Sequence, residues 1–250
     1  MSQRILVVAL LMIVGLAIGS FLGTLVLRLP AGKPVVLSRS SCPNCGRKLT
    51  PIELVPLVSW SIQGGRCRGC AEPIPRFYPA MEAGAALVPL WASLSTSGPA
   101  LLFSCVLGWI LLTLGVMDAR TYRLSDALTV PLVIAGIAAS AALDWEHVLD
   151  HAIGTIAGFA ILFALARLYA AFRGREGLGT GDAKLFGAGG AWVGWQGLAP
   201  VALVAGLAGL GAVFLARALG RKVDANTRIP FGVFLTAGIW IVWLYAPLGL

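Results

Sequence analysis

Residues 5–27 read ILVVALLMIVGLAIGSFLGTLVL, a stretch of 23 residues without a charged side chain. An α-helix rises 1.5 Å per residue, so about 20 apolar residues span the roughly 30 Å of hydrocarbon in a bilayer. Only Arg4 precedes the stretch as a basic residue, and no small-residue cleavage motif follows it. We therefore expect a retained membrane helix rather than a cleaved signal peptide.

The composition extends this expectation to the whole chain of 250 residues. Hydrophobic residues make up 58% and charged residues 12%, whereas soluble domains carry about 25% charged residues. This composition excludes a soluble globular domain and a disordered chain, and five cysteines are too few for a disulfide-rich secreted scaffold. We expect eight membrane helices, at about 5–27, 77–96, 100–118, 126–143, 148–171, 184–196, 198–217 and 230–248. The sixth is short and rich in glycine, which fits a short, a tilted or a buried helix.

The basic residues lie on one side of the predicted helices. Residues 28–76 hold eight Lys and Arg against two acids, and the alternation of the helices brings 18 of the 19 basic residues to that side. Residues 144–150, on the other side, hold three acids and no Lys or Arg. The positive-inside rule therefore places the basic side in the cytoplasm and both termini outside it. The rule also accounts for the net charge of +8, so we expect no nucleic-acid partner.

Four of the cysteines form two C-x2-C pairs in the predicted cytoplasmic loop, with 21 residues between the pairs. They are Cys42, Cys45, Cys67 and Cys70. Two such pairs at this spacing predict a structural zinc site, because four thiolates complete a tetrahedron and leave the metal no open position. Disulfides or a redox pair are the alternative, but the cytoplasm keeps thiols reduced. We expect the charge of the thiolates to be offset by basic neighbours, namely Lys48, Arg66 and Arg68.

These features predict an all-α polytopic membrane protein of about eight helices, with a small cytoplasmic zinc-binding domain between the first and the second. Its three expected parts are the first membrane helix, the zinc-binding domain and a seven-helix membrane domain, at 1–27, 28–76 and 77–250. The fifth cysteine, Cys105, lies in an apolar segment and is expected to be a small buried side chain.

Four acidic residues lie in or beside the predicted membrane helices, where an ionisable group is costly and a functional role is the default hypothesis. They are Glu82, Asp118, Asp126 and Asp182. Helix capping is the alternative for Asp126 and Asp182, because each begins a predicted helix. Asp182 follows GLGTG, and these glycines let a peptide backbone approach it closely. A phosphate-binding loop would place Lys and a hydroxyl directly after the glycines, so the Asp argues against one.

Asp118 and Asp182 both lie at the predicted cytoplasmic boundary. Two neighbouring carboxyl groups do not easily ionise together, so they share a proton and titrate as a unit. One carboxylate can then activate water while its neutral partner donates a proton to a carbonyl oxygen, as in aspartic proteases. Because 63 residues separate the two, the sequence does not show whether they meet.

Four segments occur in a characteristic order along the chain. They are GSFLGTLVLRLP in the first helix, the loop from SRSSCPNCGRKL to PRFYPAMEAGAAL, GLGTGDAKLFGAGGAWVGW, and the C-terminal IPFGVFL. Together they resemble bacterial type IV prepilin peptidases over nearly the whole chain. Three positions depart from the family pattern: Gly23 replaces an Asn, Ser125 replaces a Pro, and Val233 replaces a Pro after IPFG. Neither aspartate of the pair is affected.

The resemblance implies that the chain cleaves the basic leader of prepilins and type II secretion pseudopilins, at the cytoplasmic boundary of the bacterial inner membrane. It implies Asp118 and Asp182 as the catalytic pair. It also implies methylation of the new N-terminal amine from S-adenosylmethionine, and it nominates four residues of the loop region for the donor, namely Gly65, Arg66, Arg76 and Glu82. The same four also fit a turn glycine, two topology-setting charges and a helix-end acid.

Three other functions stay open. The chain fits a peptidase without methyltransferase activity, and it fits a non-enzymatic zinc-loop scaffold of a pilus or secretion machine. The scaffold leaves the GxGD segment without a role. A transporter with a proton relay would carry acids deep within its helices and inverted repeats, and the sequence shows neither.

Overall fold

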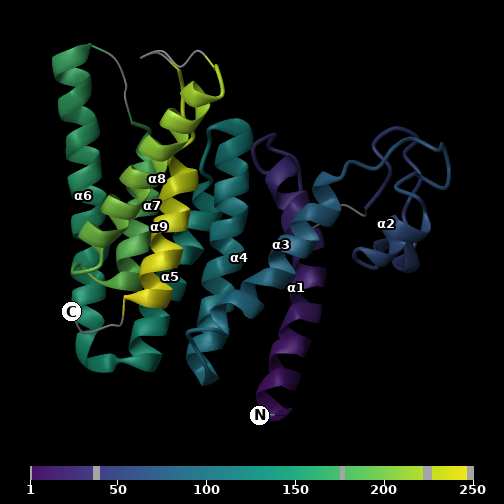
Figure 1. The fold of residues 1–250 in the computed structure, drawn as a ribbon, viewed down its shortest axis with the longest axis horizontal. Helices are drawn as coiled ribbons and strands as arrows, with labels where there is room; N and C mark the ends of the chain where they lie inside the picture. The colour runs from purple at the N-terminus through teal and green to yellow at the C-terminus, as the bar shows by residue number, and fades with distance from the viewer. Residues whose placement is uncertain (1, 36–39, 175–177, 222–226, 247–250) are drawn as a thin grey trace. The chain divides into compact units, whose positions relative to one another are not determined.

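The computed structural model describes residues 2–35, 40–174, 178–221 and 227–246. In these four ranges the regular structure is helical, and there is no strand beyond two isolated β-bridges. The predicted all-α fold is therefore confirmed. The chain divides into two compact units, Met1–Ser97 and Gly98–Leu250, which are described separately below (Figure 1).

The first unit is built on two helices packed together, α1 (Ser2–Arg28) and α3 (Phe77–Ala92). Glycines spaced four residues apart on α1 allow this close packing, because any side chain there would collide with α3. A Cβ atom on Gly15 would lie 2.6 Å from a carbonyl oxygen of α3, and one on Gly19 would lie 2.6 Å from the Cα atom of Glu82. The glycines therefore bring α1 against the part of α3 that carries Glu82.

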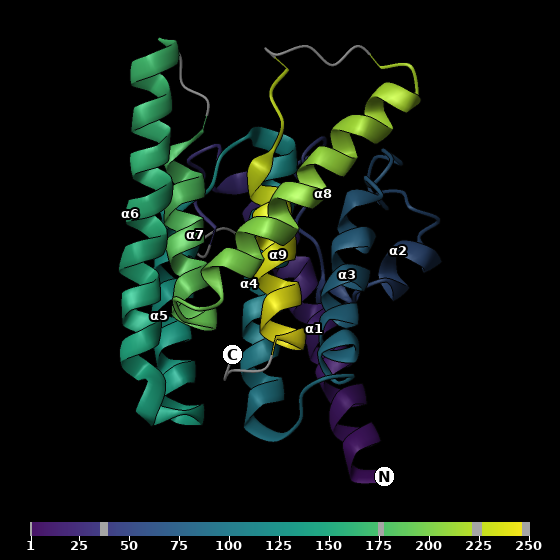
Figure 2. The same ribbon diagram turned by 60° about the vertical axis from the view of Figure 1, so that its left-hand side comes forward.

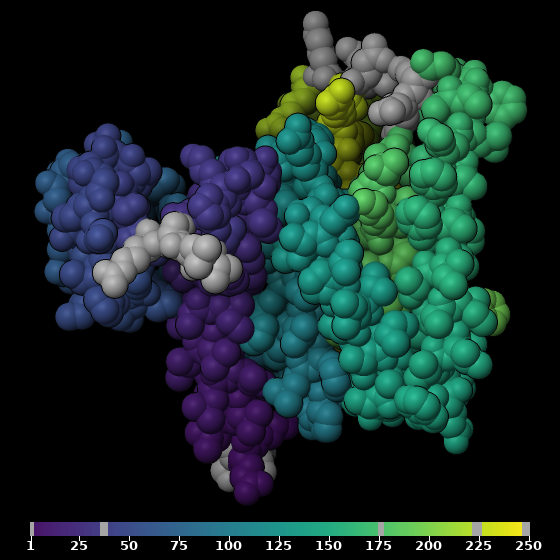
Figure 3. All heavy atoms as spheres, turned by 180° about the vertical axis from the view of Figure 1, so that it is seen from behind, coloured from purple at the N-terminus to yellow at the C-terminus, as the bar shows by residue number. Residues whose placement is uncertain are grey.

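Residues 40–76 form a lobe beside α1 and α3 (Figures 1 and 3). The lobe contains two short helices, η1 (Pro51–Leu54) and α2 (Val58–Ile62). The buried hydrophobic side chains of the lobe are those of Cys42 and Cys67. A segment of this size without an apolar core needs another source of stability, such as a metal or disulfides.

The second unit contains six long helices. They are α4 (Gly98–Thr121), α5 (Asp126–Leu143), α6 (Val148–Arg173), α7 (Thr180–Val193), α8 (Leu198–Ala218) and α9 (Phe231–Tyr245), with the short η2 (Trp145–His147) before α6. Helix α7 is central, because residues 185–193 are all buried and α5, α6, α8 and α9 all contact it. Figure 2 shows α8 crossing α9 obliquely, with α6 and α7 alongside each other.

Small and aromatic residues hold α7 in place. A Cβ atom on Gly190 would lie 2.2 Å from the carbonyl oxygen of Gly154, so α7 and α6 pack with their backbones in contact. Trp192 is fully buried, and its Nε1–H donates to the carbonyl oxygen of Leu132 in α5 at 2.9 Å. Its ring meets that of Trp243 of α9 edge to face, with centroids 5.2 Å apart. Helix α7 is therefore fixed from three sides.

All eight predicted membrane segments are helical in the structure. Five of these helices, α1, α4, α5, α6 and α8, are long and apolar enough to cross a membrane. The other three, α3, α7 and α9, have 16, 14 and 15 residues, short of the roughly 20 that a perpendicular span needs. That these three cross the membrane stays a prediction. The expected end of the last segment, at 248, lies outside the described residues.

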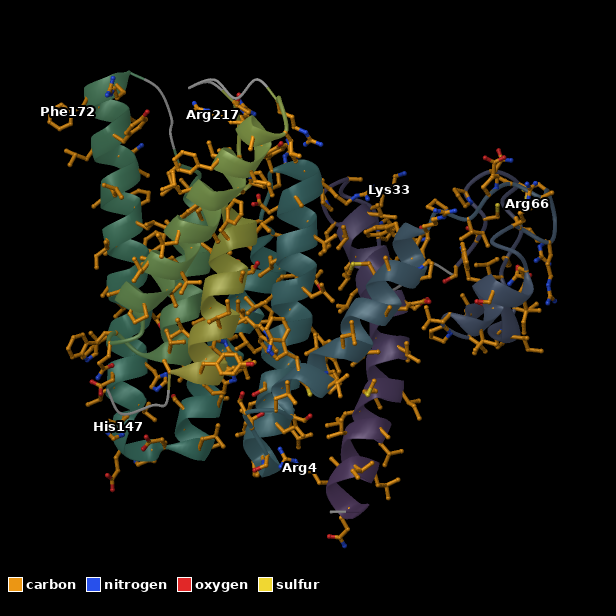
Figure 4. The ribbon with its side chains drawn as sticks, viewed as in Figure 1. Arg4, Lys33, Arg66, His147, Phe172 and Arg217 are labelled. Carbon is orange, nitrogen blue, oxygen red and sulfur yellow. The ribbon has the colours of Figure 1, made fainter. Side chains whose placement is uncertain are left out.

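The connections of the second unit gather at two ends. Figure 4 shows His147 at one end, and Phe172 and Arg217 at the other. Basic residues occupy the last turns of α4, α6 and α8 as Arg120, Arg173 and Arg217. This distribution agrees with the alternation of helices on which the predicted orientation rests.

Candidate active site and metal centre

Asp118 lies in the last turn of α4, with 5% of its surface exposed. Its Oδ2 atom is buried and, in the described part of the chain, has no hydrogen-bond partner. The first turn of α9 lies beside it, since a Cβ atom on Gly232 would be 2.8 Å from Oδ2. The N–H groups in the first turn of a helix lack intrahelical acceptors and carry partial positive charge. The start of α9 therefore suits a carboxylate at this position.

Asp182 lies in the first turn of α7. The N–H of Gly179, the N-cap residue, donates to its Oδ2 at 3.3 Å. Burial, together with the negative charge of Asp118, raises the pKa of Asp182 to about 6. The two carboxyl groups are thus close enough to interact electrostatically. Asp182 therefore caps α7 and also interacts with Asp118, and its catalytic role stays a prediction. Gly177, the first glycine of its motif, lies outside the described residues.

Leu124 lies between the start of α7, which carries Asp182, and the start of α9, which lies beside Asp118. A Cβ atom on Gly181 would be 3.2 Å from the Cβ atom of Leu124, and one on Gly232 would be 3.2 Å from its Cδ1. At the start of α5, the carboxylate of Asp126 forms an ion pair with the Nζ atom of Lys184 in α7 at 2.7 Å. Both side chains of this pair are exposed. The ion pair links the start of α5 to α7.

Two interacting carboxyl groups beside a glycine-rich backbone supply an acid, a base and room for an extended peptide. Sequence reasoning missed two neighbours of these groups, Gly232 and Leu124. Gly232 lies in IPFGVFL, which carried the resemblance but was given no role. Its contact with Asp118 depends on the packing of α9 against α4, which no local spacing encodes.

The four cysteines of the lobe converge. Their Sγ atoms all lie within 4.8 Å of one another, which is compatible with binding one metal ion. Both pairs adopt the same turn, in which the first cysteine donates its N–H to the carbonyl oxygen five residues later, at 2.9 Å in each case. The residue four positions after the first cysteine has a positive φ in both turns, 70° at Gly46 and 57° at Ala71. The two turns therefore form a matched pair around one point.

The chemistry of this donor set fits zinc. The N–H of Gly69 donates to the Sγ atom of Cys67 at 3.4 Å, which stabilises the thiolate that a metal requires. Four sulfur donors around one point are typical of a closed, tetrahedral zinc site. A zinc ion bound by all four thiolates would have no open position for a substrate.

Arg47 supplies positive charge beside the cysteines. A Cβ atom on Gly69 would lie 3.2 Å from the Nε atom of Arg47 and 3.4 Å from the Sγ atom of Cys45. Arg47 also forms an ion pair with the buried Glu53, which accepts the N–H of Thr50 at 2.9 Å. The residues that we expected to offset the thiolate charge are exposed, namely Lys48, Arg66 and Arg68. Sequence reasoning did not single out Arg47 for this role.

One of the four residues nominated for the methyl donor lines a cavity, and a second contacts a residue that lines it. This cavity, of about 220 Å³, is lined by residues of α1, α3 and the lobe, and Glu82 is among them. Gly65 contacts Trp60, another lining residue, because a Cβ atom on Gly65 would lie 2.8 Å from the indole Cζ2 atom. Arg66 and Arg76 are exposed and do not line the cavity.

Comparison with family models divides the chain at the same place as the structure. Residues 13–96 match the model of the bacterial peptidase A24 N-terminal domain, and residues 105–214 match that of the type IV leader peptidase family. The boundary between the matches thus coincides with the boundary between the two compact units, at Ser97.

Individual proteins match across both units. A prepilin leader peptidase/N-methyltransferase of Burkholderia pseudomallei (strain 1026b) is 36% identical over 257 residues, covering 92% of this chain and 82% of that protein. Proteins of the same name from Aeromonas salmonicida (strain A449) and Pseudomonas aeruginosa are 34% and 32% identical, covering 84% and 93% of this chain and 72% and 88% of their own. No solved structure matches the chain. On these similarities, together with the aspartates and cysteines that the fold gathers, the chain belongs to the type IV leader peptidase family.

Proposed function

We propose that the protein is a prepilin leader peptidase that also N-methylates its product. It removes the basic leader of type IV prepilins and type II secretion pseudopilins, and it then methylates the new N-terminal amine. The observation that carries the cleavage function is the interaction of Asp118 with Asp182 in a member of this family. The names of the relatives support the methylation.

Cleavage follows from the chemistry of the two carboxyl groups. One carboxylate takes a proton from water as the water oxygen attacks the scissile carbonyl carbon, and its protonated partner donates to the carbonyl oxygen. The tetrahedral intermediate then collapses, the C–N bond breaks, and the leaving amine takes the proton that came from water. The other carboxylate recovers its proton from the hydroxyl of the intermediate. The pair ends with one proton, as it began, and no bond forms between substrate and protein.

The glycine-rich segment gives the substrate access to this pair. Gly179 and Gly181 flank the start of α7 without side chains, so an extended peptide can approach Asp182. The apolar segment of a prepilin would remain in the lipid, with its leader junction at the cytoplasmic boundary. Lipid and prepilin are therefore the expected partners, and nucleic acid is not.

The remaining parts of the proposal concern cofactors. Zn²⁺ bound by the four cysteines would stabilise the lobe, whose buried hydrophobic side chains are those of two of these cysteines. S-adenosylmethionine supplies an electrophilic methyl group when bound. We place the donor in the first unit, where Glu82 lines a cavity and Gly65 contacts Trp60 of the cavity wall. We keep Arg66 and Arg76 as surface positions of the same region.

The orientation in the membrane completes the proposal. The basic helix ends of the second unit and the lobe lie on the cytoplasmic side of the inner membrane, and both termini lie in the periplasm. The chain is then organised by function as a first membrane helix (1–27), a zinc-binding domain (28–76) and a seven-helix peptidase domain (77–250).

The rival proposals are a peptidase without methyltransferase activity and a non-enzymatic scaffold. The test uses purified enzyme and a prepilin in proteoliposomes with S-adenosylmethionine, and it reads the intact mass of the product. We expect loss of the leader plus one methyl group with the wild type, and uncut substrate with Asp118→Asn and with Asp182→Asn. Asp126→Asn, which removes an exposed carboxylate of the same end of the unit, is the matched control and should cleave.

Each other outcome selects a rival. Loss of the leader without the methyl mass would establish a peptidase only. Full cleavage by either Asp118→Asn or Asp182→Asn would refute the pair. Uncut substrate with the wild type, across several prepilins of the same organism, would favour the scaffold.

A further inference from the structure

We propose that the cavity of the first unit binds the sulfonium end of the methyl donor, with Glu82 as the counter-ion and the rings of Trp60 and Tyr78 as its aromatic lining. The inference rests on the proposed methyltransferase function and assigns residues to it. It starts from the chemistry of the cavity, which combines a buried carboxylate with aromatic side chains. That combination is suited to a small organic cation.

Within the described ranges, Glu82 is a buried carboxylate without a basic partner. It lies on α3 with 6% of its surface exposed, and it lines the cavity. Its Oε2 atom accepts the N–H of Leu57 at 2.8 Å, and no lysine or arginine of the described ranges forms an ion pair with it. Burying an unpaired charge is costly, so buried carboxylates normally have a cation beside them. A cationic ligand would supply the missing partner.

Glu53 provides the contrast within the same cavity wall. It is equally buried and also lines the cavity, but Arg47 neutralises it. Residues 28–76, which carry Glu53 and precede Glu82 of α3, hold eight Lys and Arg against two acids, so a carboxylate left without a cation at Glu82 is unexpected for packing alone. The carboxylate of Glu82, buried without a cation beside it, therefore points to a cationic ligand.

The indole of Trp60 is held in a defined position at this cavity. Its Nε1–H donates to the carbonyl oxygen of Ile74 at 3.2 Å. Gly65 packs against the ring with φ of 67°, a conformation that favours glycine, and a side chain there would collide with the indole. Tyr78 is fixed on α3, where a Cβ atom on Gly23 would meet its ring at an ordinary 3.5 Å. Gly65, which the resemblance implied for the methyl donor, would therefore act by allowing the indole of Trp60 to take this position.

The size and the other walls of the cavity narrow the choice of ligand. Pockets that enclose a whole drug-sized ligand measure about 300–1,000 Å³, so about 220 Å³ suits the sulfonium and amino-acid end of the donor. Arg28 also lines the cavity and can attract the carboxylate of that end. Cys42 and Cys67 form part of the same wall, so zinc binding would shape the cavity.

The N-terminal ammonium of the cleaved prepilin offers the same positive charge, and the experiment separates the two sources. Binding is measured by calorimetry on full-length protein in lipid nanodiscs, without prepilin. The probes are S-adenosylmethionine and S-adenosylhomocysteine, which lacks the methyl group and the sulfur charge. We expect the wild type to prefer S-adenosylmethionine by at least about tenfold, because the charge of Glu82 acts at short range and low effective dielectric.

Variants then assign the preference to Glu82. Glu82→Gln keeps an oxygen for the Leu57 N–H and should remove the preference, so that both probes bind like S-adenosylhomocysteine. Glu146→Gln is the control, because Glu146 is exposed in the second unit and does not line the cavity, and it should keep the preference. Removal of zinc should weaken the binding of both probes.

Three results would overturn the inference. The wild type could bind both probes equally, and this result does not depend on whether any variant folds. Glu82→Gln could weaken both probes by the same factor, which would give Glu82 a structural role at Leu57. A short peptide with the mature prepilin N-terminus could displace S-adenosylmethionine competitively, which would assign the cavity to the amine. Since no cleavage is measured, these results are independent of whether the proposed peptidase acts on prepilins.

Discussion

Substituting Gly232 by Ala tests whether the first turn of α9 positions Asp118. The added Cβ atom would lie 2.8 Å from the Oδ2 atom and 3.0 Å from the Cγ atom of Asp118, and 3.2 Å from Leu124. The carboxylate oxygen would have to move by about 0.6 Å to reach the 3.4 Å of an ordinary contact. Because a misplacement of about 1 Å costs roughly a hundredfold in rate, we expect kcat for leader cleavage to fall by about tenfold. KM should change little, because the substitution does not touch the glycines beside Asp182.

The matched control is Gly238→Ala, in the same helix. A Cβ atom there would lie 2.8 Å from the carbonyl oxygen of Val201, so it introduces an equal collision with α8 and none with Asp118. Both substitutions overpack the unit and should lower the free energy of unfolding by about 1–3 kcal/mol. The assay compares kcat and KM of the three proteins at equal folded concentration. Equal losses of kcat in the two variants, or an unchanged kcat in Gly232→Ala, would refute a positioning role for Gly232.

Two further predictions concern the zinc-binding lobe. Mercurial titration of the thiols should release one zinc per chain, and metal-free wild-type protein would contradict the site. Arg47→Gln should lower the zinc retained under chelator competition by about tenfold, because the substitution leaves Glu53 buried without its partner. The control is Arg68→Gln, at an exposed residue, which should retain zinc. Ala71→Gly should raise zinc affinity by about twofold to fivefold, because Ala71 has the positive φ that Gly46 has in the other turn, and glycine adopts this conformation without strain. An unchanged or lower affinity in the same competition assay would count against the matched turns.

The sequence allowed the elements to be predicted better than their contacts. Long apolar stretches such as residues 5–27 form helices because the lipid leaves the backbone no other hydrogen-bond partners, and all eight predicted segments are helical. The four cysteines could be identified because the spacing within each pair sets the geometry of its turn. Hydropathy does not distinguish a full span from a shorter buried helix, so the lengths of α3 and α9 were not predicted, whereas the sixth segment was expected to be short, as α7 is.

Contacts between distant segments could not be predicted from local patterns. Gly232 meets Asp118 only because α9 packs against α4, and Arg47 reaches the second cysteine pair across the lobe. The cavity beside Glu82 depends on the close approach of α1 and α3, which Gly15 and Gly19 permit. Each of these features combines residues that are ordinary in their own segments. A glycine, an arginine or a helix-end glutamate acquires its role only from the neighbour that the fold supplies.

The most direct test of the central claim is a double-mutant cycle on leader cleavage, with Asp118→Asn, Asp182→Asn and the double variant in proteoliposomes. Residues that act as one catalytic unit lose nearly all of their effect with the first substitution. If the two carboxyl groups share one proton and act together, each single variant and the double variant will show the same residual rate, while Asp126→Asn cleaves like the wild type. A double variant much slower than either single variant, or substantial cleavage by one of them, would show that the two aspartates do not act as a pair.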